Sequence, residues 1–172
     1  MYNGVQARAN NVRTISGVSQ FERALKGYAA ANGAYPDFGY SACLGLGYPD
    51  TNGDGQPDCG ASDYPTPKND EFNEKMLQLL ANLPVVNARP VAISDSVTFM
   101  GGIVVHWEEF RVNGVVNPYY LMYALEGSAK DCGNSGVVDH ETEWPNMRSP
   151  ASQSYSWTGP GYTMCVVPLP NV

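Results

Sequence analysis

A segment of nine residues in the first half of the chain has oxygen-bearing side chains at the spacing that a hard cation needs. The segment Asp50-Thr51-Asn52-Gly53-Asp54-Gly55-Gln56-Pro57-Asp58 has the form D-x-N-x-D-G-x-x-D. Side-chain oxygens at loop positions 1, 3, 5 and 9, with glycine at position 6 for a sharp turn, let a short peptide wrap around Ca²⁺. The predicted ligands are the side chains of Asp50, Asn52, Asp54 and Asp58 and the backbone carbonyl of Gln56. Three carboxylates this close repel one another unless a cation neutralises them, so the segment predicts a calcium site.

The ligand set is incomplete within the nine residues. The loop resembles the calcium loops of EF-hand and thrombospondin type 3 proteins, but Ala61 stands where an EF-hand has its bidentate glutamate at position 12. A further ligand would then come from Asp63, a backbone carbonyl or water. Magnesium fits less well, because it tolerates irregular cages poorly. The alternative is an Asx-rich surface turn without metal, since Asp, Asn and Gly all favour turns.

Four cysteines with no C-x-x-C spacing favour disulfides over zinc or redox chemistry. Three pairings are possible. We predict the local pairing, Cys43 with Cys59 and Cys132 with Cys165, because crossed pairings would tie the Asp-rich loop to the last strand. The first bond would close a loop of about 15 residues, which is worth about 3 kcal/mol in the chain-entropy model.

Composition indicates one secreted-type globular domain and argues against two functional classes. The chain has 172 residues, 43% hydrophobic and 16% charged, which suffices for one sizeable core. A net charge of -7 argues against a general nucleic-acid binder, because phosphate contacts need clustered Lys and Arg. No Walker loop, dinucleotide fingerprint or nucleophile elbow is present, so we do not expect an enzyme. The turn 133–136 and His106 are better explained as a turn beside Cys132 and a sheet residue than as a nucleophile and a base, and Asp139, His140, Glu141 and Glu143, which could bind a metal, are typical of a solvated loop.

Residues 2–33 form a proline-free stretch that predicts one long amphipathic helix. Apolar residues recur every three or four positions at Val5, Ala9, Val12, Ile15, Val18, Phe21, Leu25 and Tyr28. The face predicted to be polar carries Arg8, Asn11, Arg13, Ser16, Gln20, Glu22, Arg23 and Lys26. Asn32-Gly33 predicts a left-handed C-terminal cap, and Pro36 prevents the helix from resuming. Such a helix is about 45 Å long, so it must project or form one end of something larger.

The run YNGVQARANNVRTISGVSQFERALKGYAAANGAYP, residues 2–36, resembles the segment of bacterial type IV pilins that follows their membrane-spanning half-helix. The resemblance implies that an apolar transmembrane half precedes this segment, and we interpret Met1 as a start placed where that half would have ended. No window of 18 or more apolar residues occurs in the sequence. In this family a cysteine pair commonly closes the C-terminal region, which Cys132 and Cys165 match.

The resemblance implies a structural subunit that polymerises through its helix into a type IV pilus for adhesion, motility or DNA uptake. Its partners would be other pilin subunits and minor pilins, with the precursor anchored in the cytoplasmic membrane and the filament on the cell surface. A pseudopilin of a type II secretion or competence system is the close alternative. From another class, a stand-alone calcium-dependent adhesin or binding module would use the aromatic loop that holds Trp144, Tyr155 and Trp157. An ordinary long surface helix remains the alternative for residues 2–33.

The rest of the chain predicts an α+β fold, a pilin-like roll in which the long helix packs on one antiparallel sheet. We expect a single domain 1–172, with a disulfide-bracketed loop region at 37–68, a second helix at 69–83, a linker at 85–90 and the sheet within 91–172. The second helix has an apolar stripe at Phe72, Met76, Leu79, Leu80 and Leu83. Strands are expected at 96–99, 103–107, 110–112, 118–125 and 162–167, with a hairpin turn at Asn113-Gly114.

Overall fold

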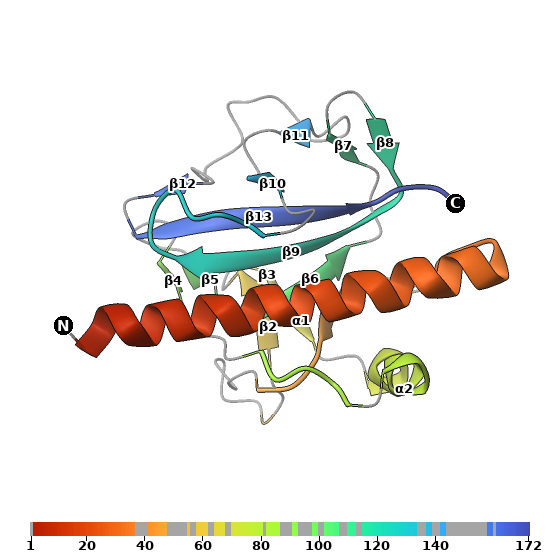
Figure 1. The fold of residues 1–172 in the computed structure, drawn as a ribbon, viewed down its shortest axis with the longest axis horizontal. Coiled ribbons are helices and arrows are strands. Elements are labelled where there is room, and N and C mark those ends of the chain that lie inside the picture. Colours follow the sequence, from red (N-terminus) through yellow and green to blue (C-terminus); the bar gives the residue numbers. More distant parts are fainter. Residues whose placement is uncertain are drawn as a thin grey trace.

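A helix of 31 residues, α1 (Tyr2–Asn32), lies across one face of an antiparallel β-sheet (Figure 1). The computed structural model describes residues 2–36, 41–47, 55, 58–61, 64–67, 70–80, 82–86, 91–92, 98–99, 102–106, 110–112, 115–133, 137–138, 142–143, 158–159 and 161–172. Figure 1 shows α1 crossing the width of the molecule below the two longest strands in this view, with the chain ends at opposite sides. The predicted α+β class is confirmed.

The long helix begins and ends as its sequence predicts. No proline interrupts residues 2–32, and α1 stops where Gly33 adopts a φ of 74°. The N–H of Gly33 donates to the carbonyl of Ala29 at 2.8 Å, which satisfies one of the last helical carbonyls. The left-handed cap predicted at Asn32-Gly33 is therefore confirmed.

The main sheet has six strands in the order β1-β6-β9-β13-β10, with β12 also paired to β13. The strands are β1 (Ala42–Leu44), β6 (Ile103–His106), β9 (Tyr119–Glu126), β10 (Val137–Val138), β12 (Thr158–Gly159) and β13 (Tyr162–Leu169). β9 and β13 pair over their whole length, from Tyr119 opposite Leu169 to Glu126 opposite Tyr162. This central pair is the platform on which α1 packs.

Two smaller sheets replace part of the single sheet that the sequence predicted within 91–172. One has the order β11-β7-β8 and comprises β7 (Phe110–Val112), β8 (Val115–Asn117) and β11 (Thr142–Glu143). Its antiparallel β7–β8 pair confirms the predicted hairpin. The other has the order β3-β2-β5-β4 and comprises β2 (Asp58–Ala61), β3 (Tyr64–Pro67), β4 (Val91–Ala92) and β5 (Thr98–Phe99). The expectation of one sheet is therefore wrong.

The region 37–68, predicted as a loop region, contains three of these strands. β1 is an edge of the main sheet and pairs with β6. β2 and β3 form an antiparallel pair despite Pro65 and Pro67. β3 lies at the edge of its sheet, where a missing backbone N–H is tolerated. The prediction of a loop is therefore wrong for the residues of β1, β2 and β3.

The second helix, α2 (Asp70–Leu79), is shorter than the predicted 69–83. Met76 is fully buried, but Leu79 is 41% exposed, so the predicted apolar stripe is wrong at that position. The predicted linker at 85–90 also begins inside the packed structure. Val86 is buried, and its N–H donates to the carbonyl of Leu46 at 2.8 Å.

The core lies between α1 and the main sheet. The helix contributes Val18, Phe21, Leu25 and Ala29, which are all buried. The sheet contributes buried side chains from four strands, namely Leu44, Ile103, Val105, Leu121, Tyr123, Leu125, Cys165, Val167 and Leu169. All the α1 residues named here belong to the second half of the helix, so its first half is held differently.

Candidate functional site

The predicted calcium loop lies mostly outside the described residues. Asp50, Asn52, Asp54 and Gln56 are all outside them, as is Asp63, whereas Asp58 is the first residue of β2, opposite Pro67. Gly55, at loop position 6, adopts a φ of 83°, a conformation that glycine reaches without strain. Among the described residues, no three His, Cys, Asp or Glu side chains lie together in a group that could hold a metal ion. The calcium site stays a prediction.

Both ends of this loop are covalently tied together. Cys43 in β1 is bonded to Cys59 in β2, with 5.9 Å between their Cα atoms, as the sequence predicted. Both cysteines are fully buried. The bond therefore joins the main sheet to the β2–β3 pair at the base of the loop.

The residues that follow β1 are fixed by contacts that the sequence did not reveal. The N–H of Gly45 donates to Oδ1 of Asn73 in α2 at 3.2 Å, and the N–H of Leu46 donates to the carbonyl of Pro84 at 3.0 Å. Gly45 has a φ of 92°, and a Cβ there would come within 2.7 Å of the Pro84 carbonyl oxygen. Only glycine fits where the chain after β1 passes this close to Pro84. Asparagine within a helix carries no sequence signal for such a role.

The outward side of α1 is the second candidate site. Val5 is 74% exposed and Val12 61% exposed, although the sequence placed both in the buried stripe. Arg8, Arg13 and Arg23 are exposed, as predicted. The first half of α1 therefore presents apolar and cationic side chains to its surroundings.

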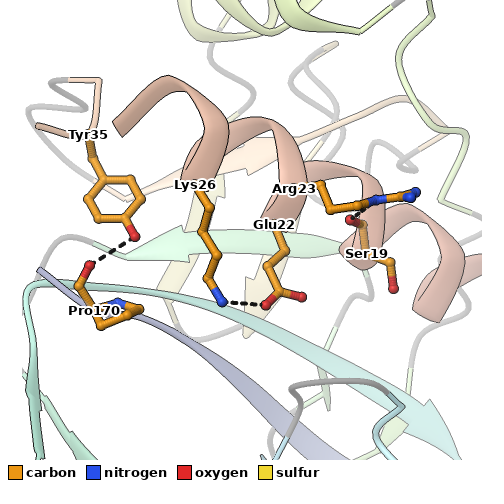
Figure 2. Close-up of polar contacts among 6 residues, drawn as sticks. All are labelled: Ser19, Glu22, Arg23, Lys26, Tyr35 and Pro170. Carbon is orange, nitrogen blue, oxygen red and sulfur yellow. Dashed lines mark hydrogen bonds and ion pairs between the residues drawn. The ribbon is translucent and has the colours of Figure 1, made fainter. Parts of the chain in front are cut away.

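The inward side of α1 is partly polar, which corrects the predicted polar face at Glu22 and Asn11. Glu22 is 6% exposed and pairs with Lys26 at 2.6 Å on the side of α1 that faces the strands (Figure 2). At the end of the same helix, the hydroxyl of Tyr35 donates to the carbonyl of Pro170 at 2.9 Å (Figure 2). Tyr35 thus fastens the chain after α1 to the C-terminal end of β13.

Two asparagines hold the first half of α1 against the end of β9. Asn11 donates from Nδ2 to the carbonyl of Glu126 at 2.9 Å and accepts from the Glu126 N–H at 2.9 Å. Asn10, which is 7% exposed, donates to Oε1 of Glu126 at 3.3 Å. The side-chain amide of Asn11 therefore pairs with the backbone as a neighbouring strand would.

The second predicted disulfide, Cys132–Cys165, is also present and joins the turn after β9 to β13. The Tyr123 hydroxyl donates to the carbonyl of Cys132 at 2.5 Å. Gly133 approaches the middle of α1 so closely that a Cβ there would lie 2.5 Å from Cγ2 of Ile15. The disulfide thus fixes this turn between the sheet and the helix. Burial, and then the charges of Glu22 and Asp131, raise the pKa of Tyr123 well above its usual range.

Replacing Tyr123 with phenylalanine should lower the free energy of unfolding by about 1–2 kcal/mol, because the buried Cys132 carbonyl loses its donor. The folded-state pKa of Tyr123 is raised, so its stabilising contribution is complete below about pH 10 and is lost as the pH rises further. Urea unfolding at pH 8 and pH 10.5 should show that the free energy of unfolding falls more between these pH values in the parent than in Tyr123→Phe. Parallel pH dependences would contradict this assignment.

Most residues of the weak catalytic and metal-binding candidates lie outside the described residues, whereas His106 is the last residue of β6 and Glu143 the last of β11. Gly133 is the only described member of the turn 133–136, and Asp139, His140 and Glu141 lie outside the described residues, as do Trp144, Tyr155 and Trp157. Within the part of the chain that the structure describes, no helix is long and apolar enough to cross a membrane. Comparison with models of known protein families, with curated proteins and with solved structures finds no match.

Proposed function

We propose that this protein is a structural subunit of a bacterial type IV pilus that polymerises through its N-terminal helix. The observation that carries the proposal is the division of α1 into two halves. The second half is buried on the sheet through residues such as Phe21 and Leu25, while the first half exposes Val5 and Val12. An exposed apolar helix face on an otherwise packed domain is typical of an interaction site.

In this proposal, an apolar segment continuous with α1 holds the precursor in the cytoplasmic membrane and is later buried among neighbouring subunits. The sheet domain then forms the outside of a cell-surface filament that serves adhesion, motility or DNA uptake. The resemblance of residues 2–36 to type IV pilins supports this arrangement, as does the long helix packed on an antiparallel sheet.

The codons upstream of Tyr2 and a gene deletion test this function together. We expect a short charged leader followed by about 20 apolar residues, the length that spans a bilayer. Electron microscopy of the deletion strain should show no filaments if the subunit is the major pilin, and should show them persisting if it is a minor one. Upstream codons without an apolar segment would contradict the proposal in either case. Loss of protein secretion with cell-surface filaments intact would instead favour the pseudopilin.

We also propose that calcium orders the loop from Asp50 to Asp58 and that this order is needed for subunits to pack. The spacing of carboxylates supports it, together with the positive φ of Gly55 and the Cys43–Cys59 bond at the base. Asp50, Asn52, Asp54 and Asp58 would bind through side chains and Gln56 through its carbonyl. With no glutamate at position 12, the site belongs to the weak extracellular kind, with a dissociation constant near 10⁻⁴ M.

Calcium should therefore raise the thermal unfolding midpoint of the parent protein and leave the midpoint of Asp54→Ala unchanged. At about 1 mM calcium, roughly ten times the dissociation constant, linkage stabilises the fold by about 1.4 kcal/mol. Glu74→Ala removes an exposed carboxylate from α2 and is the matched control, which should respond as the parent does. Melts with calcium and with chelator on metal-free protein measure this shift. Equal midpoints with and without calcium in the parent would mean that the loop is only a turn.

A further inference from the structure

Among the described residues, the outward face of α1 is exposed at positions along the helix. Val5, Ala9, Val12 and Ser16 are exposed and follow one another at steps of three and four, so they share one face. A Cβ built at Gly4 or Gly27 would meet no atom within 4 Å. The described parts of the chain therefore leave this face uncovered at both ends.

This face carries positive charge on an acidic protein. Residues 2–32 contain Arg8, Arg13, Arg23 and Lys26 against the single carboxylate of Glu22, a formal charge of +3. Glu22 is buried and paired with Lys26, so it does not neutralise the exposed arginines. Because the whole chain carries -7, the residues outside α1 carry -10. The two parts of one chain are thus complementary to each other.

Charge also decides against the simplest partner, another α1. Packing two outward faces together would bring Arg8 and Arg13 of both copies to one seam, where like charges oppose association. An acidic surface instead gains attraction at the rim while the valines are covered at the centre. Exposed carboxylates outside α1 include Glu74 in α2 and Asp131 after β9.

We propose that the outward face of α1 binds a carboxylate-bearing surface of a second copy of this chain, outside the α1 of that copy. The contact joins two different surfaces, so it does not close on itself and can continue from copy to copy. It rests on the proposed function and names what the folded half of each subunit meets in the assembly.

Photo-crosslinking of the 172-residue chain identifies the partner surface. Val12 is replaced by p-benzoylphenylalanine, the protein is irradiated at high concentration, and the covalent dimer is digested and mapped. We expect cross-links to acidic peptides outside residues 2–32. Cross-links to residues 2–32 of the second copy, or the absence of a dimer, would overturn the proposal.

Charge reversal tests the electrostatic part by sedimentation. Arg13→Glu should weaken self-association about three- to tenfold, because it turns attraction at one surface site into repulsion. Lys130→Glu makes the same change in net charge at an exposed residue outside α1 and should associate no more weakly than the parent. Equal weakening by both variants would show that only net charge matters. Binding of the parent to phosphatidylglycerol vesicles, with no cross-linked dimer, would assign the face to a membrane instead.

These experiments distinguish failure of the proposed contact from failure of the proposed function. Loss of filaments on gene deletion without the expected cross-links would leave the pilus subunit standing and remove this contact. Cross-links with no apolar segment upstream of Tyr2 would leave the contact standing as a mode of self-association outside a pilus.

Discussion

Removing the Cys132–Cys165 disulfide should lower the free energy of unfolding by about 4 kcal/mol. The bond joins residues 33 positions apart, and the chain-entropy model assigns about 3.7 kcal/mol to a loop of that length. Its loss also frees the Cys132 carbonyl from the position in which it accepts the Tyr123 hydroxyl. The variant is Cys132→Ala with Cys165→Ala, since serine would leave hydroxyl groups without partners at two buried sites.

The other disulfide supplies the control for this measurement. Cys43 and Cys59 are 16 positions apart, so Cys43→Ala with Cys59→Ala should cost less, about 3 kcal/mol. Urea unfolding followed by circular dichroism gives both values under the same conditions. A loss below about 1 kcal/mol for the Cys132 pair, or a larger loss for the Cys43 pair, would show that loop length does not govern the effect.

Elements with local signals were predictable from the sequence. The absence of proline and the Asn32-Gly33 cap define α1, and runs of β-branched and aromatic residues define β6, β9 and β13. The local pairing of four cysteines was predictable as well. In each of these cases the decisive residues lie within the element or beside it.

Strand partners were not predictable, because they depend on residues far away in sequence. β1 pairs with β6, about sixty residues further on, and its three residues are too few to show alternation. β5 pairs with β2 and β4 rather than with the main sheet. Likewise, the hydrogen bond from Gly45 to Asn73 joins the segment after β1 to α2. Nothing in the sequence of either segment predicts this contact.

The same limit applied to the candidate sites. Ligand types and their spacing in residues 50–58 predict a cation, but the hydrogen bonds of Gly45 to Asn73 and of Leu46 to Pro84, just before the loop, emerged only from the fold. On α1, the sequence identified the exposed arginines and assigned Glu22 to the wrong side. Its side chain is buried and pairs there with Lys26, one turn later.

The sequence predicts the wrong buried face in the first half of α1 because too many of its apolar residues are spaced three positions apart. A helix turns about 100° per residue, so a step of three falls about 60° short of a full turn. From Val12 through Ile15 and Val18 to Phe21, three such steps add up to about half a turn. The stripe therefore winds around the helix, and Val12 and Phe21 lie on opposite sides.

Replacing Phe21 with alanine should therefore cost about 3–5 kcal/mol in unfolding free energy, whereas Val12→Ala should cost almost nothing. Phe21 is fully buried, and its ring lies 3.5 Å from a Cβ built on Gly45, so truncation leaves a cavity between α1 and the segment after β1. Val12 is 61% exposed, and alanine is the better helix former.

Urea unfolding of the two variants separates the side of α1 that stabilises the subunit from the side that is free to bind. A loss above about 1 kcal/mol for Val12→Ala would contradict the assignment of the outward face. If Val12→Ala keeps full stability but reduces self-association, apolar side chains serve folding in one half of α1 and assembly in the other.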